Sequence, residues 1–93
     1  MTKTLTFHSD PGHAWLEVPK QLFFAVGYAP SRSSYETSSK VYLEEDCDAT
    51  FFLMKAEEKG LSFEFESKFY NQDCFVRRLS NMSGVGFVNP YRK

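Results

Sequence analysis

One stretch of the chain, Leu61-Ser62-Phe63-Glu64-Phe65-Glu66-Ser67, alternates apolar and polar side chains without a break. This period of two is typical of a β-strand with one buried face and one wet face, because successive side chains point to opposite faces. The chain must therefore contain a sheet that is covered on at least one side. With 93 residues it has room for one such core.

The segment before this strand has the pattern of a helix that packs on a sheet. Asp46-Cys47-Asp48 precedes it as an N-terminal cap, and Gly60 ends it. Between them, apolar side chains recur at spacings of three and four: Ala49, Phe52, Leu53 and Ala56. We expect a helix over 49–59 with this face against the sheet.

Four shorter strands are expected earlier in the chain. Segments 4–8 and 14–18 alternate, and Asp10-Pro11-Gly12 between them suits a type II turn with Gly at positive φ. Pro19 and Gly27 are typical of the start and end of a short helix. Segments 32–37 and 40–45 are then expected to form a second hairpin.

Residues 74–79 are the last strand candidate. The resulting order, ββα-ββα-β(β), predicts an α+β fold: a single-domain antiparallel sheet of five or six strands with two helices on one face. We expect this domain over residues 1–82. Residues 83–93, which contain Gly84, Gly86 and Asn89-Pro90, are expected to form a flexible tail.

Charge and hydropathy limit the compartment and the class of partner. Eleven basic and twelve acidic residues give a net charge of -1, which argues against a strong binder of polyanions and against an acidic mimic of DNA. No apolar run approaches the roughly 18 residues of a membrane span, and the first residues lack the apolar core of a signal peptide. We expect a cytoplasmic protein without a membrane partner, with Cys47 and Cys74 as reduced, buried thiols.

A candidate metal site lies at the first turn. His8, Asp10 and His13 supply two imidazoles and a carboxylate, which are ligands for a divalent ion. The alternative is structural: Asp10 accepts hydrogen bonds from the turn, and the histidines bond nearby backbone. Zinc would need a further ligand, so we expect no cofactor.

The densest charge cluster comprises Glu44, Glu45, Asp46 and Asp48. A basic partner could bind there, although acidic residues also stabilise a helix N-terminus by about 0.3–1 kcal/mol each. Trp15 and Tyr35 are expected on outward faces, where aromatic residues suit protein interfaces. The candidate protein-binding residues are therefore His13, Trp15, Tyr35, Glu44, Glu45 and Asp48.

A second candidate surface is basic. Residues 36–66 hold nine acids and three bases, whereas residues 67–93 hold one acid and five bases. Aromatic residues are interleaved with these bases and could stack on nucleic-acid bases. The candidate nucleic-acid-binding residues are Lys68, Arg77, Arg78, Arg92 and Lys93. A solvated last strand with basic ends is the alternative.

Residues 7–19, FHSDPGHAWLEVP, and residues 42–49, YLEEDCDA, resemble motifs of short uncharacterised proteins of phages, plasmids and other mobile elements. The resemblance covers about residues 7–49. It implies a small accessory protein in a bacterial host cell, and it implies no particular chemistry.

Three hypotheses follow. The first is a non-enzymatic binder or inhibitor of a host protein, for example an anti-defence factor comparable to an anti-CRISPR protein. The second is a metal-dependent hydrolase centred on His8, Asp10 and His13. The third is a nucleic-acid-binding module that uses the basic C-terminal segment. A homodimer would also be compatible with an exposed edge strand.

Overall fold

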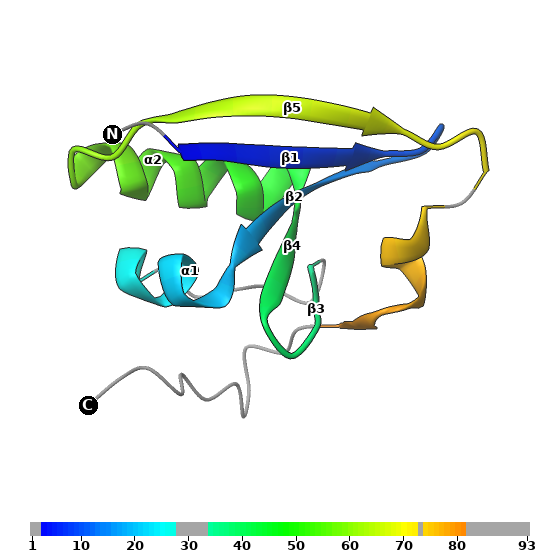
Figure 1. Cartoon of the computed structure of the whole chain (residues 1–93), viewed down its shortest axis with the longest axis horizontal. Coiled ribbons are helices and arrows are strands. Elements are labelled where there is room, and N and C mark those ends of the chain that lie inside the picture. The colour runs from blue at the N-terminus through cyan, green and yellow to red at the C-terminus, as the bar shows by residue number, and fades with distance from the viewer. Residues whose placement is uncertain (1–2, 28–33, 73, 82–93) are drawn as a thin grey trace.

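The computed structural model describes residues 3–27, 34–72 and 74–81, and only the backbone of Cys47, Arg77, Ser80 and Asn81. Its centre is a six-stranded sheet in the order β5-β1-β2-β4-β3-β6 (Figure 1). The elements are β1 (Lys3–Ser9), β2 (Ala14–Pro19), α1 (Lys20–Val26), β3 (Tyr35–Glu36), β4 (Lys40–Glu44), the π-helical turn η1 (Glu45–Ala49), α2 (Thr50–Glu58), β5 (Phe63–Phe69), the 3-10 helix η2 (Phe75–Arg78) and β6 (Ser80–Asn81). The expected α+β class is confirmed.

The main core lies between the sheet and both helices. Strand residues of alternating position meet Phe23 and Val26 of α1 and Phe52 and Ala56 of α2. The strand residues fully or almost fully buried in this core are Leu5, Leu16, Val18, Val41 and Leu43. Figure 1 shows α1 and α2 close together, so the prediction of two helices on one face is confirmed.

The opposite face of the sheet carries a second, smaller core. Trp15 and Tyr42 are buried there against Cys74 and Val76, and Phe75 packs against the same group. These last residues belong to η2 and its N-terminal cap, which lie at the other end of the molecule from α1 and α2 (Figure 1). The strand expected over 74–79 is therefore wrong. In the observed 3-10 helix, Val76 packs onto the face of the sheet. A strand at 74–79 would instead have extended the sheet at its edge.

The sheet is mixed, whereas an antiparallel sheet was expected. Strands β1 and β2, β2 and β4, β4 and β3, and β3 and β6 pair antiparallel, but β5 pairs with β1 in parallel. The cause is the connection through α2. A helical crossover returns the chain to the end of the sheet where β4 began, so that β5 runs in the direction of β4 and of β1.

The turn at 10–13 is not of type II. Among the described glycines only Gly27 and Gly60 have positive φ, at 84° and 79°. The turn is instead held by the Asp10 carboxylate, whose Oδ1 accepts the N–H groups of Gly12 and His13 at 2.9 and 3.0 Å. Gly27 and Gly60 follow α1 and α2 as expected, since the left-handed conformation there suits glycine.

Two other expectations concern parts of the chain with a partial description. Cys74 is buried, as expected, while the side chain of Cys47 lies outside the described residues. The tail expected over 83–93 also lies outside them. Within the described ranges no helix is long and apolar enough to cross a bilayer.

Candidate functional site

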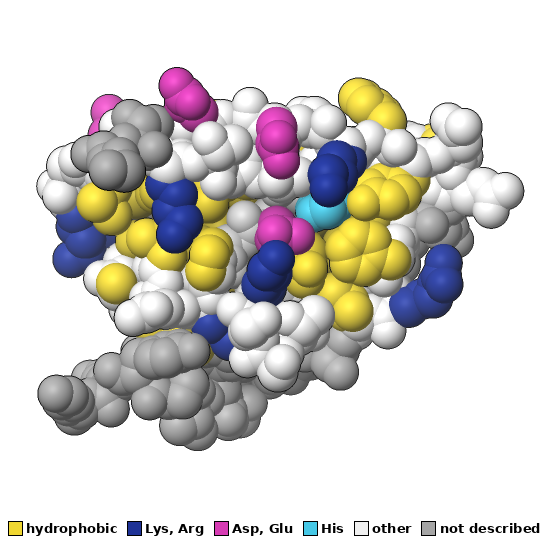
Figure 2. Space-filling model, in the orientation of Figure 1, with side chains coloured by type: hydrophobic (Ala, Val, Ile, Leu, Met, Phe, Trp, Pro, Cys, Tyr) yellow, Lys and Arg dark blue, Asp and Glu magenta, His cyan; other side chains and the backbone are white. Residues whose placement is uncertain are grey.

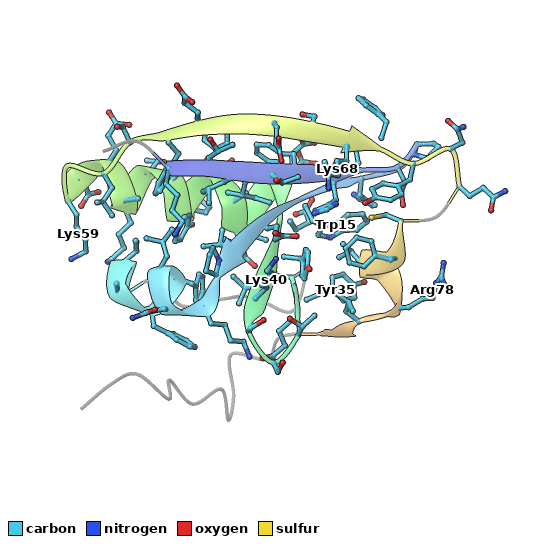
Figure 3. All side chains as sticks on the ribbon, viewed as in Figure 1. Trp15, Tyr35, Lys40, Lys59, Lys68 and Arg78 are labelled. Carbon is cyan, nitrogen blue, oxygen red and sulfur yellow. The ribbon has the colours of Figure 1, made fainter. Side chains whose placement is uncertain are left out.

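Five of the six residues expected to contact a partner lie together, where β2, β3 and β4 run side by side. Trp15 lies opposite Glu44 in the β2–β4 register, and Tyr35 lies opposite Tyr42 in the β3–β4 register. The Trp15 ring centroid is 5.9 Å from that of His13 and 6.1 Å from that of Tyr35. Figure 3 shows Trp15 and Tyr35 in the same part of the sheet. We name these five residues, His13, Trp15, Tyr35, Glu44 and Glu45, together with Asp46, whose N–H donates to Glu44 Oε1 at 3.3 Å, the acidic-aromatic corner.

Solvent exposure varies across the acidic-aromatic corner. The His13 side chain is 51% exposed and the Glu44 side chain 15%, with His13 Nδ1 3.9 Å from Glu44 Oε1. Glu45 and Asp46 are exposed, and Tyr35 is half-buried. The corner thus offers solvent two exposed carboxylates, part of a third, and parts of the His13 and Tyr35 rings.

Trp15 does not lie on the surface, contrary to the expectation from sequence. The residue is 2% exposed, because Cys74 and Val76 cover its face of the sheet. The rings of His13 and Tyr35 both pack against its indole. It therefore acts on the corner by positioning these two rings.

Asp48 is also buried, and it does not cap α2. The hydroxyl of Ser34 donates to Asp48 Oδ2, and the N–H of Glu44 donates to Ser34 Oγ at 3.0 Å. The N-cap position of α2 is Ala49, without a side-chain cap bond. Asp48 thus fixes the turn from β4 into η1, which leaves Glu45 and Asp46 on the outside.

A second cluster of polar side chains lies on the same face of the sheet, next to the second core. His8 is 4% exposed, with Nε2 2.9 Å from Glu17 Oε1 and Nδ1 2.9 Å from the Tyr70 hydroxyl oxygen. The ammonium of Lys40 donates to Glu17 Oε2 at 3.0 Å. Figure 2 shows this face, with a histidine beside a carboxylate and hydrophobic side chains gathered next to it. We name His8, Glu17, Lys40, Tyr42 and Tyr70 the His8 network.

The hydrogen bonds of the His8 network define which ring nitrogen of His8 donates, and burial in the network changes the pKa of its two tyrosines. A carboxylate can only accept, so in the neutral imidazole Nε2–H donates to Glu17 and Nδ1 accepts from Tyr70. Burial, with the charge and hydrogen bond of Glu17, raises the pKa of Tyr42 to about 12. Burial, with Cys74 and Glu17 nearby, also raises the pKa of Tyr70. The raised pKa values keep both phenols protonated near neutral pH. The hydrogen bond between His8 and Tyr70 ties the residue that follows β5 to β1.

Sequence reasoning missed Glu17, Lys40, Tyr42 and Tyr70 as members of one network. The period of two does place His8, Glu17 and Tyr42 on outward faces of their strands. Three polar or amphipathic residues at neighbouring outward positions were the available signal. The pairing that unites them depends on strand order, which the pattern of a single strand does not contain.

The carboxyl of Glu17 gives a pH-dependent prediction. Burial alone would raise its pKa, but hydrogen bonds and charge from Lys40 and His8 outweigh burial and lower it from 4.5. A carboxyl whose pKa is lower in the folded state stabilises the fold above the unfolded pKa, and this contribution fades as the pH falls through the folded pKa. Glu17→Gln should therefore cost about 1 kcal/mol at pH 7, and the deficit relative to wild type should shrink below pH 4.5.

Urea unfolding at pH 7 and at pH 3.5 checks this difference. Glu64→Gln is the matched control, because Glu64 is exposed on β5. A Glu17→Gln deficit of the same size at both pH values would contradict the prediction.

The three candidate metal ligands are not brought together. Both ring nitrogens of His8 face Tyr70 and Glu17, and His13 lies beside Glu44. The Asp10 carboxylate accepts the N–H of Cys74 through Oδ2 and two turn N–H groups through Oδ1. Across the described ranges, no three His, Cys, Asp or Glu residues are grouped to hold an ion. The structural alternative for Asp10 is the one observed.

The basic candidates are separated in space. Lys68 lies on β5 and Arg78 on η2, both exposed, and Figure 3 shows them well apart. The Arg77 side chain, Arg92 and Lys93 lie outside the described residues. Of the interleaved rings, Tyr70 and Phe75 pack around His8, whereas Phe69 is 83% exposed.

Comparison of the chain with protein-family models, curated proteins and solved structures gave no match. The side chains of the His8 network are hydrogen-bonded to one another, whereas the acidic-aromatic corner exposes the carboxylates of Glu45 and Asp46 and parts of the His13 and Tyr35 rings.

Proposed function

We propose that the protein is a non-enzymatic binder, and that its acidic-aromatic corner docks an Arg- or Lys-rich segment of a partner protein. The observation that carries the proposal is that His13, Tyr35 and Glu44 all lie around Trp15. The exposed carboxylates of Glu45 and Asp46 follow directly in the chain. In the setting that the resemblance implies, the partner would be a host protein in the bacterial cytoplasm. The effect would be inhibition, as in an anti-defence factor.

The chemistry of the corner favours cationic side chains. A carboxylate binds an Arg or Lys head by charge and hydrogen bonds, and an aromatic face beside it binds the same head by a cation–π interaction. Both kinds of group are present within one corner of the sheet. Complementary charge of this kind gives specificity and a fast, salt-sensitive association.

The proposal predicts that reversing the exposed charges weakens binding without unfolding the protein. In Glu45→Lys/Asp46→Lys, both altered side chains are exposed, so the cost to the fold is the lost helix-dipole interaction, about 1 kcal/mol. The matched control is Glu57→Lys/Glu58→Lys, which reverses two exposed charges on α2. We expect about tenfold weaker affinity for the first variant and little change for the second.

The experiment has two steps. Tagged wild-type protein and both variants are used to capture proteins from a bacterial lysate, and a protein retained by wild type is purified. Its affinity for all three is then measured by calorimetry at low and high salt. Loss in the corner variant alone, with affinity that falls as salt rises, supports the proposal. Equal affinity for all three proteins, or no captured protein, overturns it.

A further inference from the structure

Strand β5 forms one edge of the sheet, and its outer side has no partner in the described part of the chain. It is seven residues long, and six of its side chains are exposed. Phe69 is 83% exposed and Phe65 is 47% exposed. A long edge strand with apolar side chains is a template on which another strand can pair.

The sequence of β5 limits which strand that is. A second copy would close a symmetric pair, antiparallel about a two-fold axis. Opposed residues in an antiparallel ladder point to the same face, so one residue must lie opposite the same residue of the second copy. The two-fold axis then passes midway between these two residues, and we name the axis after that central residue. Each choice of central residue then fixes every cross-strand pair.

The choices differ in charge. An axis through Glu66 sets this carboxylate against itself, and an axis through Phe65 sets Glu64 against Glu66 twice. An axis through Ser67 instead pairs Glu66 with Lys68 of the second copy, and Phe65 with Phe69 of the second copy, each twice. This register contains two opposite-charge pairs, two aromatic pairs and no like-charge pair, which favours it over the others.

Side chains of the neighbouring strand β1 contact β5 residues of both the aromatic and the charged pairs in this register. On the helix face, the Phe7 and Phe65 rings lie 5.6 Å apart, so that Phe69 of a second copy would extend an existing aromatic row. On the other face, the Thr6 hydroxyl donates to Glu66 Oε1 at 2.8 Å. That contact restrains the Glu66 side chain beside the position that Lys68 of a second copy would reach.

We propose that the protein forms a homodimer in which the two β5 strands pair antiparallel, with the two-fold axis at Ser67. The two sheets become one continuous sheet, and the helices of both copies lie on its same face. This proposal does not rest on the acidic-aromatic corner, which lies around β2, β3 and β4.

A charge swap tests the register. Glu66→Lys alone and Lys68→Glu alone each place two like-charge pairs at the interface, and each should raise the dimer dissociation constant about tenfold or more. The double variant Glu66→Lys/Lys68→Glu restores both opposite-charge pairs and should return the dissociation constant to near the wild-type value. Glu64→Lys is the matched control, because in this register Glu64 lies opposite Tyr70 rather than a charge.

Sedimentation velocity over a range of concentrations measures these constants, and circular dichroism checks that each variant is folded. Dimerisation of wild type, its loss in both single variants and its recovery in the double variant support the proposal. A wild type that stays monomeric throughout the range overturns it. A dimer that is insensitive to the single changes, or one that the double change does not restore, also overturns it.

Discussion

Phe52→Ala should lower the free energy of unfolding by about 3–5 kcal/mol, the usual cost of emptying a buried aromatic site. Phe52 is completely buried between the sheet and α1. Its ring stacks on Phe23 at 5.8 Å and on Phe63 at 6.4 Å, so that one side chain joins both helices to the edge strand. The total free energy of unfolding of a small domain is about 5–15 kcal/mol, so this loss would leave the variant barely folded.

The neighbouring residue supplies a control of the same chemistry. Phe51 is 52% exposed, so Phe51→Ala should change the unfolding free energy by no more than about 0.5 kcal/mol. Urea titration followed by circular dichroism compares the two variants. Similar losses for Phe51→Ala and Phe52→Ala would contradict the observed orientation of α2.

Asp10→Ala should cost about 3 kcal/mol, because it leaves three backbone N–H groups without their acceptor. Asp10 is 7% exposed, and its carboxylate accepts the N–H groups of Gly12 and His13 in the turn and of Cys74, which precedes η2. It therefore links the β1–β2 turn to a segment more than sixty residues later. We expect both the turn and the second core to loosen.

Asp10→Asn separates these two roles. The amide oxygen can replace Oδ1 towards Gly12 and His13, but the amide nitrogen is a donor and cannot accept the N–H of Cys74. Trp15, the single tryptophan, lies in the second core and reports on it. The Asn variant should keep its secondary structure, while its tryptophan emission shifts to longer wavelength. Emission identical to wild type would contradict the role of the Cys74 bond.

The elements with strong local patterns were predictable from sequence. Alternation located β1, β2, β4 and β5, and the apolar stripe located α2, whose observed bounds Thr50–Glu58 fall within the expected 49–59. These patterns are local. In a strand every second side chain faces the core, and in a helix every third or fourth does. The apolar faces of Leu16, Val41 and Phe52 followed directly from them.

The parts that could not be predicted depend on contacts between distant segments. The parallel direction of β5 follows from the crossover through α2, and the bond from Tyr70 to His8 spans 62 positions. Trp15 was wrongly expected at the surface for the same reason, because the residues that cover it are distant in sequence. Its strand face was correctly separated from that of Leu16, but only the placement of Val76 shows that this face is also covered. A short apolar run at 74–76 was the available signal.

The acidic-aromatic corner was predictable as a set of residue types and not as a surface. His13, Tyr35 and Glu44 were chosen for their chemistry, and strand order brings them together. Asp48, chosen for its charge, is buried because Ser34 supplies a hydroxyl donor that no helix pattern indicates.

The pairing of β1 with β5 has a consequence for how the protein is made. Residues 3–9 are synthesised some sixty positions before their neighbours at 63–69 and before the residues that contact His8 and Asp10. Contacts between such distant segments form slowly, because a long loop must close first. Until then β1 lacks its outer neighbour, and β1 itself is an edge that other nascent chains can reach. The interval between synthesis of the first and fifth strands is thus the period in which chaperone binding would matter most.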